Sequence, residues 1–217
     1  MKQTVFSICI VCIAYLGLSG CTSSPPVVPA ATPQNTTEEG LVRVENSRFD
    51  EVYVRSGFDL TDFDAVILAP VSVSYKSTRP ENELNDRQLD LMKRYFREEL
   101  EGAFGESGQY ALVDKAGIRT MRIYAGITDL EINVPTDMPA IHRNVVFVAS
   151  SGKMTLVTDV YNAQTNEILV RIKDRRQARD HWHKATSISE WSEVRAAFRY
   201  WAGIASDRID AAHANRL

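Results

Sequence analysis

Cysteine is scarce in this sequence, and the positions of the few cysteines exclude two kinds of site. The chain has 217 residues and three cysteines, Cys9, Cys12 and Cys21, all near the N-terminus. The remaining sequence can therefore form neither a disulfide nor a thiolate metal site. It also lacks the G-x-S-x-G elbow, the Walker A loop, and the G-x-G-x-x-G, H-E-x-x-H and EF-hand motifs. These absences argue against the familiar enzyme classes, so we predict a protein that is not an enzyme and has no cofactor.

Positive charge is the second shortage. Lys and Arg total 25 against 28 Asp and Glu, which gives a formal net charge of −3. The two signs are mixed along the chain and no basic block stands out. Because phosphate backbones are bound mainly through clustered Lys and Arg, nucleic acid is not an expected partner.

The N-terminus carries the one long apolar run, at residues 5–18 behind Lys2. It falls short of the roughly 20 residues that span a membrane as a helix. It ends at Leu18-Ser19-Gly20-Cys21, which resembles the lipobox of bacterial lipoproteins. The resemblance implies that residues 1–20 are a signal peptide and that Cys21 is lipidated, with palmitate among its acyl chains, and so anchors the protein to a membrane. Under the sorting pattern of such proteins Thr22 points to the outer membrane, facing the periplasm. An ordinary secreted protein and an uncleaved anchor are the alternatives.

Residues 21–39 are predicted to form the lipidated cysteine and a disordered tether. This stretch holds four of the eight prolines and no aromatic residue. Such a composition cannot bury enough apolar surface to offset the entropy lost on ordering. We assign residues 40–217 to a single α/β domain, which is long enough for a sizeable core.

The first half of this domain predicts strands around a long helix. A short strand is expected at 52–54, and the apolar run 65–69 is typical of a strand buried on both faces at the centre of a sheet. A helix capped by Asn85 or Asp86 follows, with a stop at Gly105. The next strand, at 110–113, should pair in parallel with the strand before the helix.

The second half is predicted to be rich in strands. Residues 118–134 alternate between apolar and polar, and 144–161 form a second long strand, bulged around 150–152. After a turn at 162–166, the return strand becomes polar at 173–176, so we expect it to project into solvent. The last helix begins with a capping box, Ser187-x-x-Glu190, and should pack Trp191 and Trp201 on the sheet. The whole is a two-layer α/β fold, with a mixed sheet of five or six strands and two main helices on one face.

Several stretches together resemble a bacterial lipoprotein family of unknown function, domain of unknown function 3313. They are residues 64–71, 159–169, Trp191, 195–202 and 207–210, in that order. In the hairpin turn this chain has Asn166 where members often have glycine, and asparagine tolerates a left-handed backbone. The resemblance implies an envelope lipoprotein with no established activity and no catalytic residues.

Two groups of residues were weighed as metal sites, and neither leads to a predicted metal. His181 and His183, beside Asp180, have the spacing of half a zinc site, with His142 as a distant third ligand. Asp59, Asp62 and Asp64 could bind calcium, but aspartates before a strand commonly form turns. We favour the plain interpretation for both groups.

A run of basic residues could bind anionic lipid headgroups or an acidic partner. It comprises Arg171, Lys173, Arg175, Arg176 and Arg179. We favour a simpler role, in which charged residues at a sheet edge prevent pairing with other chains.

The function predicted from these patterns is a non-enzymatic outer-membrane lipoprotein of the cell envelope. It would serve as a scaffold or accessory subunit of an envelope assembly or transport system, with an envelope protein as partner. The alternative is a periplasmic lipid or small-ligand carrier, and an enzyme ranks third. A carrier needs an apolar cavity between helices and sheet, for which the helix ending at Gly105 is the first place to look.

Overall fold

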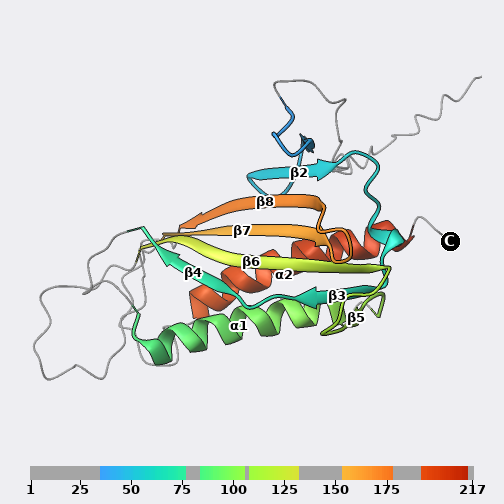
Figure 1. Ribbon diagram of the computed structural model, residues 1–217. Helices are drawn as coiled ribbons and strands as arrows, with labels where there is room; N and C mark the ends of the chain where they lie inside the picture. Colours follow the sequence, from blue (N-terminus) through green and yellow to red (C-terminus); the bar gives the residue numbers. More distant parts are fainter. Residues whose placement is uncertain (1–34, 77–83, 106–107, 132–152, 178–191, 215–217) are drawn as a thin grey trace, which may run out of the picture.

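The computed structural model describes residues 35–76, 84–105, 108–131, 153–177 and 192–214 (Figure 1). The predicted signal peptide, Cys21 and residues 22–34 of the predicted tether lie outside these ranges. In the part of the chain that is described, no helix is both long and apolar enough to cross a membrane.

The described strands form a mixed sheet of eight in the order β1-β2-β8-β7-β6-β3-β5, with β4 beside β6. Pairing is parallel for β3 with β5 and for β3 and β4 with β6, and antiparallel elsewhere. The mixed α/β class and the parallel pairing are confirmed. The bounds of the strands are β1 Leu41–Arg43, β2 Glu51–Arg55, β3 Ala65–Leu68, β4 Ser72–Tyr75, β5 Ala111–Leu112, β6 Thr120–Glu131, β7 Lys153–Asn162 and β8 Ile168–Gln177.

The expected number of strands was too low, because two strands escaped the sequence pattern. β1 has only three residues, and the apolar run that continues past Pro70 is split into β3 and β4. A proline has no N–H for a sheet ladder, so the strand breaks there. The expectation of a central strand at 65–69 is also wrong, since β3 lies second from one end of the sheet, with the two-residue β5 outside it.

β6 is the strand on which β3 and β4 both depend. Leu68 pairs with Ile123 and Ser72 with Gly126, so β6 advances three residues while the other chain advances four. At the second pair a Cβ on Gly126 would lie 2.2 Å from Ser72 Oγ and 3.3 Å from the backbone Ser72 O. Glycine at 126 therefore allows β4 to approach β6.

Alternation along β6 sends apolar side chains toward the helices. Met121, Ile123, Ala125 and Ile127 are buried, whereas Tyr124 is 48% exposed, as the sequence pattern predicts. The bulge that was predicted at 150–152 lies outside the described residues. A bulge is present on β6 instead, where Asp129 has a φ of 53° and the register with β7 shifts.

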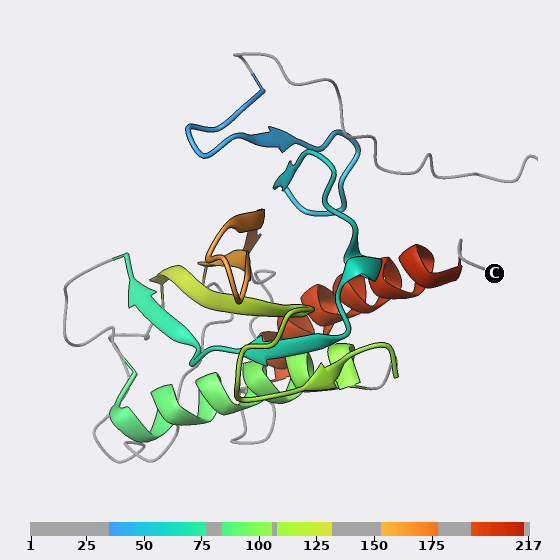
Figure 2. The ribbon, with the colours of Figure 1, turned by 45° about the vertical axis from the view of Figure 1, so that its right-hand side comes forward.

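Two helices, α1 (Asp86–Gly105) and α2 (Ser192–Ala214), lie on the same side of the sheet (Figures 1 and 2). Asn85 caps α1 as predicted: its Oδ1 accepts from Gln88 N–H at 3.0 Å, and Gln88 Oε1 accepts from Asn85 N–H at 2.9 Å. The helices meet through Phe96 and Phe198, whose rings stack at 4.7 Å. Ser187, Glu190 and Trp191 lie outside the described residues, whereas Trp201 is buried as expected.

β8 is an internal strand and not a projecting one, which corrects the expectation for residues 173–176. It pairs with β7 along its length and with β2 up to Lys173. Alternation places Asp174 on the helix side, where it is fully buried. Its carboxylate is satisfied there by Trp201 Nε1–H at 2.7 Å, Arg176 Nε–H at 2.7 Å and Asp50 N–H at 3.0 Å.

Candidate functional site

An apolar pocket of about 270 Å³ lies between the sheet and the C-terminal half of α2. Its floor is the helix-facing side of four adjacent strands. Because side chains alternate along a strand, every second residue there is apolar and points inward. The floor residues are Val52 and Val54 of β2, Val170 and Ile172 of β8, Val160 of β7, and Met121 and Ile123 of β6.

The roof of the pocket comes mainly from α2, through Ala205, Arg208 and Ile209. From α1 only its second-to-last residue, Phe104, reaches the described lining. The cavity is thus not under α1, where the sequence directed the search. It lies at the other helix because the β1–β2 end of the sheet extends beyond α1 (Figure 1).

The chain between β1 and β2 forms a side wall of the pocket through Val44, Ser47 and Phe49. We call residues 44–49 the wall segment. It is hydrogen-bonded to β2 through Val44 N–H and Val52 O at 2.8 Å. Arg48 of this segment forms an ion pair with Asp207 of α2, and its guanidinium lies 5.8 Å from the ring centroid of Tyr200. These contacts therefore hold the wall segment against α2, the helix that forms the roof of the pocket.

Arg208 is the single charged side chain among the described lining residues, and Ser47 is the other polar one. Burial lowers the pKa of Arg208, as does the nearby Arg48 cation, while Asp207 opposes this shift. No hydrogen bond or ion pair joins the Arg208 guanidinium to any residue that the structure describes. The guanidinium stays charged at neutral pH, because an arginine pKa begins far above it.

Neither Arg208 nor Arg48 is predicted as a site residue from the sequence, although one signal marks Arg208. It lies four residues after Ile204, which is 1% exposed, and next to Ile209, also 1% exposed. A helix brings positions four apart to one face, so an arginine at 208 interrupts a face that is otherwise apolar. Nothing comparable marks Arg48, which depends on a loop conformation.

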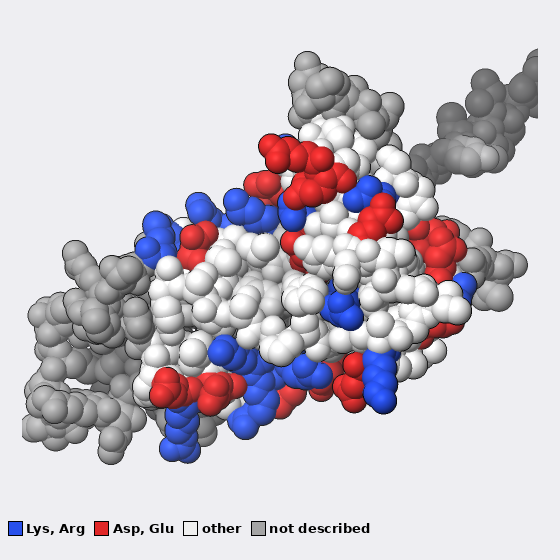
Figure 3. Space-filling model, in the orientation of Figure 1, with Lys and Arg blue, Asp and Glu red and all other residues white. Residues whose placement is uncertain are grey.

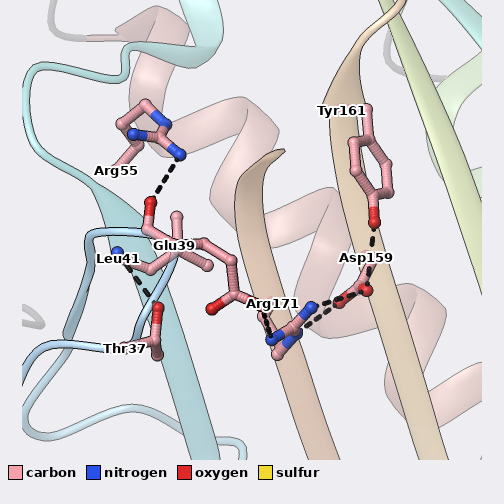
Figure 4. A network of polar contacts seen from close by, with 7 residues as sticks. All are labelled: Thr37, Glu39, Leu41, Arg55, Asp159, Tyr161 and Arg171. Atoms are coloured by element: carbon pink, nitrogen blue, oxygen red, sulfur yellow. Dashed lines mark hydrogen bonds and ion pairs between the residues drawn. The ribbon is translucent and has the colours of Figure 1, made fainter. Parts of the chain in front are cut away.

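A separate polar network lies on the outer face of the sheet, which is the face away from the helices (Figure 4). Arg171 of β8 donates to both carboxylate oxygens of Asp159 on β7, at 2.9 and 3.1 Å, and to Glu39 at 2.9 Å. The hydrogen bond from Arg171 is the main reason why the pKa of Glu39 falls to about 2. This network attaches residues 37–41, at the end of the predicted tether, to the middle of the sheet.

The basic run on β8 is largely paired with acids. Arg171 binds Asp159 and Glu39, Arg176 binds Asp174, and Lys173 lies 3.9 Å from Glu51. Arg179 lies outside the described residues. Since β8 pairs with β2 as far as Lys173, these side chains do not protect a free edge over that stretch.

Two of the three aspartates considered for calcium, Asp59 and Asp64, are engaged in separate contacts. Asp59 Oδ1 accepts from Thr61 N–H at 2.8 Å and caps the 3-10 helix η1 (Leu60–Asp62), while Asp64 pairs with Arg119 at 2.8 Å. Among the described residues no group of three His, Cys, Asp or Glu side chains could hold a metal. Asp180, His181, His183 and His142 lie outside those residues.

Fold and site together define an α/β protein in which two helices cover one face of a mixed sheet and leave an apolar pocket at one end. Residues 34–204 match the model of the family described as protein of unknown function DUF3313. The chain belongs to this family, and the resemblance seen in its sequence is thereby confirmed.

Comparison with curated proteins finds no match. Among solved structures, the chain is similar to the PelC dodecamer from Paraburkholderia phytofirmans, with 9% identity, a TM-score of 0.38, and 69% of this chain and 92% of that chain covered. It is also similar to the hypothetical protein CT253 from Chlamydia trachomatis, with 12% identity, a TM-score of 0.39, and coverage of 69% and 99%. For rare lipoprotein B from Shewanella oneidensis the identity is 17%, the TM-score 0.29, and the coverage 69% and 95%. All three likenesses are distant.

Proposed function

We propose that the protein is a non-enzymatic, lipid-anchored protein of the cell envelope that binds a small apolar molecule or an acyl chain. The pocket beneath α2 is the observation that carries this proposal. Its described lining is apolar apart from Ser47 and Arg208, and apolar cavities of this kind take up apolar ligands. Of the two leading functions considered from the sequence, the carrier is the one that requires such a cavity.

The composition of the lining also supports a binding role over catalysis. General acid–base or nucleophilic chemistry needs a nucleophile, acid or base held near a second polar group. Among the described lining residues Ser47 and Arg208 are the only polar ones, and neither a carboxylate nor an imidazole accompanies them. The lining thus favours holding a ligand over transforming it.

The envelope location in this proposal rests on the lipobox-like stretch ending at Cys21. The outer-face network adds a structural argument for the role of the tether. Glu39 is the last residue of the predicted tether and is bound by Arg171, so the chain is attached to the sheet from this residue onward. An anchor attached at Cys21 would therefore hold the pocket within a limited distance of the membrane.

A scaffold role is the second candidate, and the outer face of the sheet favours it. Side chains other than Lys, Arg, Asp and Glu cover much of this face, with basic side chains to the right of its centre, and charged side chains lie along its upper and lower margins (Figure 3). Tyr124 and Tyr161 meet edge to face there, with ring centroids 5.6 Å apart, and Tyr124 is 48% exposed. Exposed tyrosines are common at the centre of protein interfaces.

Photo-crosslinking of the full-length chain in its own membranes tests the carrier proposal. The probe is a neutral ten-carbon alcohol with a diazirine at its tail, and mass spectrometry locates the adducts. We expect adducts on peptides of β2 and β8. Ala205→Phe should reduce this labelling because it fills the pocket from the roof, whereas Ala211→Phe, at an exposed position of the same helix, should not.

Ile172→Phe fills the pocket from the floor and keeps the test decisive if Ala205→Phe fails to fold. The carrier proposal would be overturned if no adducts form, or if neither Ala205→Phe nor Ile172→Phe reduces the labelling. The scaffold is tested separately by a pull-down of the intact protein in mild detergent. A stoichiometric envelope protein that is lost in Tyr124→Ala would favour the scaffold, and its absence in the parent protein would reject it.

A further inference from the structure

We infer that the pocket takes a single acyl chain of about ten carbons ending in an anionic carboxylate or phosphate head, and that Arg208 binds this head. The inference rests on the proposed function, since it names the ligand class of the same pocket. It combines the volume of the pocket with the position of Arg208, the one charged residue among the described lining residues.

Volume sets the length of the chain. An apolar cavity of about 150 Å³ accepts one benzene molecule, which has six carbons. The pocket here measures about 270 Å³, so a chain of about ten carbons fills it. A diacyl lipid with two long chains is too large to enter completely. A single medium-length chain, or one chain of a larger amphiphile, matches the space.

Charge sets the nature of the head. Arg208 lines the pocket and is half-buried, so its guanidinium stands at the border between apolar lining and solvent. The neighbouring carboxylate of Asp207 is engaged by Arg48, and no described residue forms an ion pair with Arg208 itself. Arg48, Asp207 and Arg208 together thus carry one net positive charge at one side of an apolar cavity, and Arg208 is the member that lines it. Guanidinium groups bind carboxylate and phosphate in a fork geometry, often through two parallel hydrogen bonds.

Other heads fit this arrangement less well. A neutral alcohol would leave the guanidinium without a counterion where it is partly shielded from water, which lowers the pKa of Arg208. A quaternary ammonium head would be repelled by the Arg208 guanidinium. A ligand with both an apolar chain and an anionic head uses the lining and the arginine at once.

Competition with the crosslinkable alcohol distinguishes these heads. Full-length protein in its membranes is labelled in the presence of decanoate, decyl phosphate, 1-decanol or decyltrimethylammonium, with empty membranes correcting for partition of each compound. We expect the anionic competitors to displace the probe at about tenfold lower concentration than decanol, since a charge-assisted hydrogen bond contributes that much. The better of decanoate and decyl phosphate identifies carboxylate or phosphate as the head.

Arg208→Met removes the charge but keeps an unbranched apolar stem, and should abolish the preference without abolishing labelling. Arg199→Met is the matched control, because Arg199 is an exposed arginine of the same helix and does not line the pocket. Its preference should equal that of the parent. Equal displacement by all four heads, or a preference that survives Arg208→Met, would reject the inference while leaving the apolar pocket intact. If the crosslinkable alcohol does not label the pocket of the parent protein even without a competitor, the proposed function itself would be rejected.

Discussion

The indole Nε1–H of Trp201 donates a hydrogen bond of 2.7 Å to Asp174, a carboxylate with no exposed surface. The two residues come from α2 and β8, so the bond joins the helix layer to the sheet. Asp174 also accepts from the backbone N–H of Asp50, directly after the wall segment. One buried acid thereby connects the roof, the floor and one wall of the region around the pocket.

Removal of this acid should destabilise the protein strongly. We expect Asp174→Ala to lower the free energy of unfolding by about 3–5 kcal/mol, because the indole N–H and the Arg176 guanidinium lose a buried acceptor. Urea denaturation measures the change. Trp201→Phe should cost less, and the double variant should cost less than the sum of the single variants. Additive losses, or no loss in Asp174→Ala, would contradict this role. Lys173→Ala, at an exposed ion pair on the same strand, is the control and should change little.

The ion pair between Arg48 and Asp207 should control access to the pocket. Its side chains are 49% and 66% exposed, so Arg48→Met should change the free energy of unfolding by less than about 1 kcal/mol. We expect faster hydrogen exchange at Val44, whose N–H binds Val52 O, and faster exchange of any bound ligand. Hydrogen exchange followed by mass spectrometry measures the first effect.

Arg119→Met is a matched control for Arg48→Met. It removes the ion pair between Arg119 and Asp64, which is similarly exposed and lies away from the described lining of the pocket. It should leave exchange in the wall segment unchanged. If Arg48→Met and Arg119→Met change hydrogen exchange in the wall segment equally, the ion pair between Arg48 and Asp207 has no special influence on the pocket.

The contact between Glu39 and Arg171 should weaken in acid. The pKa of Glu39 is lowered from 4.5 to about 2 in the folded protein. The ionised carboxylate therefore stabilises the contact with Arg171 fully above pH 4.5. This contribution should be lost as the pH falls from 4.5 through about 2. Carboxyl chemical shifts measured by NMR report the titration directly. Glu39→Gln should remove the pH dependence of exchange at β1, and a Glu39 that titrates near 4.5 would show that the contact is not formed in solution.

A larger side chain at Gly126 should separate β4 from β6. In Gly126→Ala the new Cβ would lie 2.2 Å from Ser72 Oγ, which can rotate away, and 3.3 Å from the backbone Ser72 O, and we expect a loss of about 1 kcal/mol in the free energy of unfolding. Ser72→Ala removes that hydroxyl oxygen but leaves the backbone oxygen of residue 72 at 3.3 Å from the new Cβ, so it should rescue only part of the loss. The measurement is thermal unfolding of the two single variants and the double variant. An equal loss with and without Ser72→Ala would place the strain elsewhere.

Local patterns were reliable guides where the signal lies within a few residues. Asn85 caps α1 through a reciprocal bond with Gln88, and Asn166 takes a left-handed φ of 57° in the hairpin turn. The alternation along β6 agrees with the burial of Met121 and Ile127. These outcomes follow from capping, turn chemistry and the two-residue period of a strand, which need no knowledge of distant partners.

The features that could not be predicted depend on residues far apart in the sequence. Asp174 lies in a charged stretch, and its burial depends on the Trp201 indole and the Asp50 N–H, which both come from distant parts of the chain. The wall segment meets α2 through Arg48 and Asp207, which are 159 positions apart. The pocket itself is space that side chains from β2, β6, β7, β8 and both helices leave unfilled, so no single stretch of sequence encodes it.

The pairing of β2 with β8 also sets an order of events during folding. Glu51 pairs with Lys173 and Val54 with Val170, so the first strands join the sheet through residues more than one hundred positions away. Contacts this distant in sequence form slowly, because a long loop must close before any of them stabilises the chain. The hairpin of β6 and β7 with β8 can assemble from neighbouring segments, but the β1–β2 end must wait for β8. We therefore expect the pocket to be completed late in folding, so that an incompletely folded chain already has helices and a partial sheet but cannot yet hold a ligand.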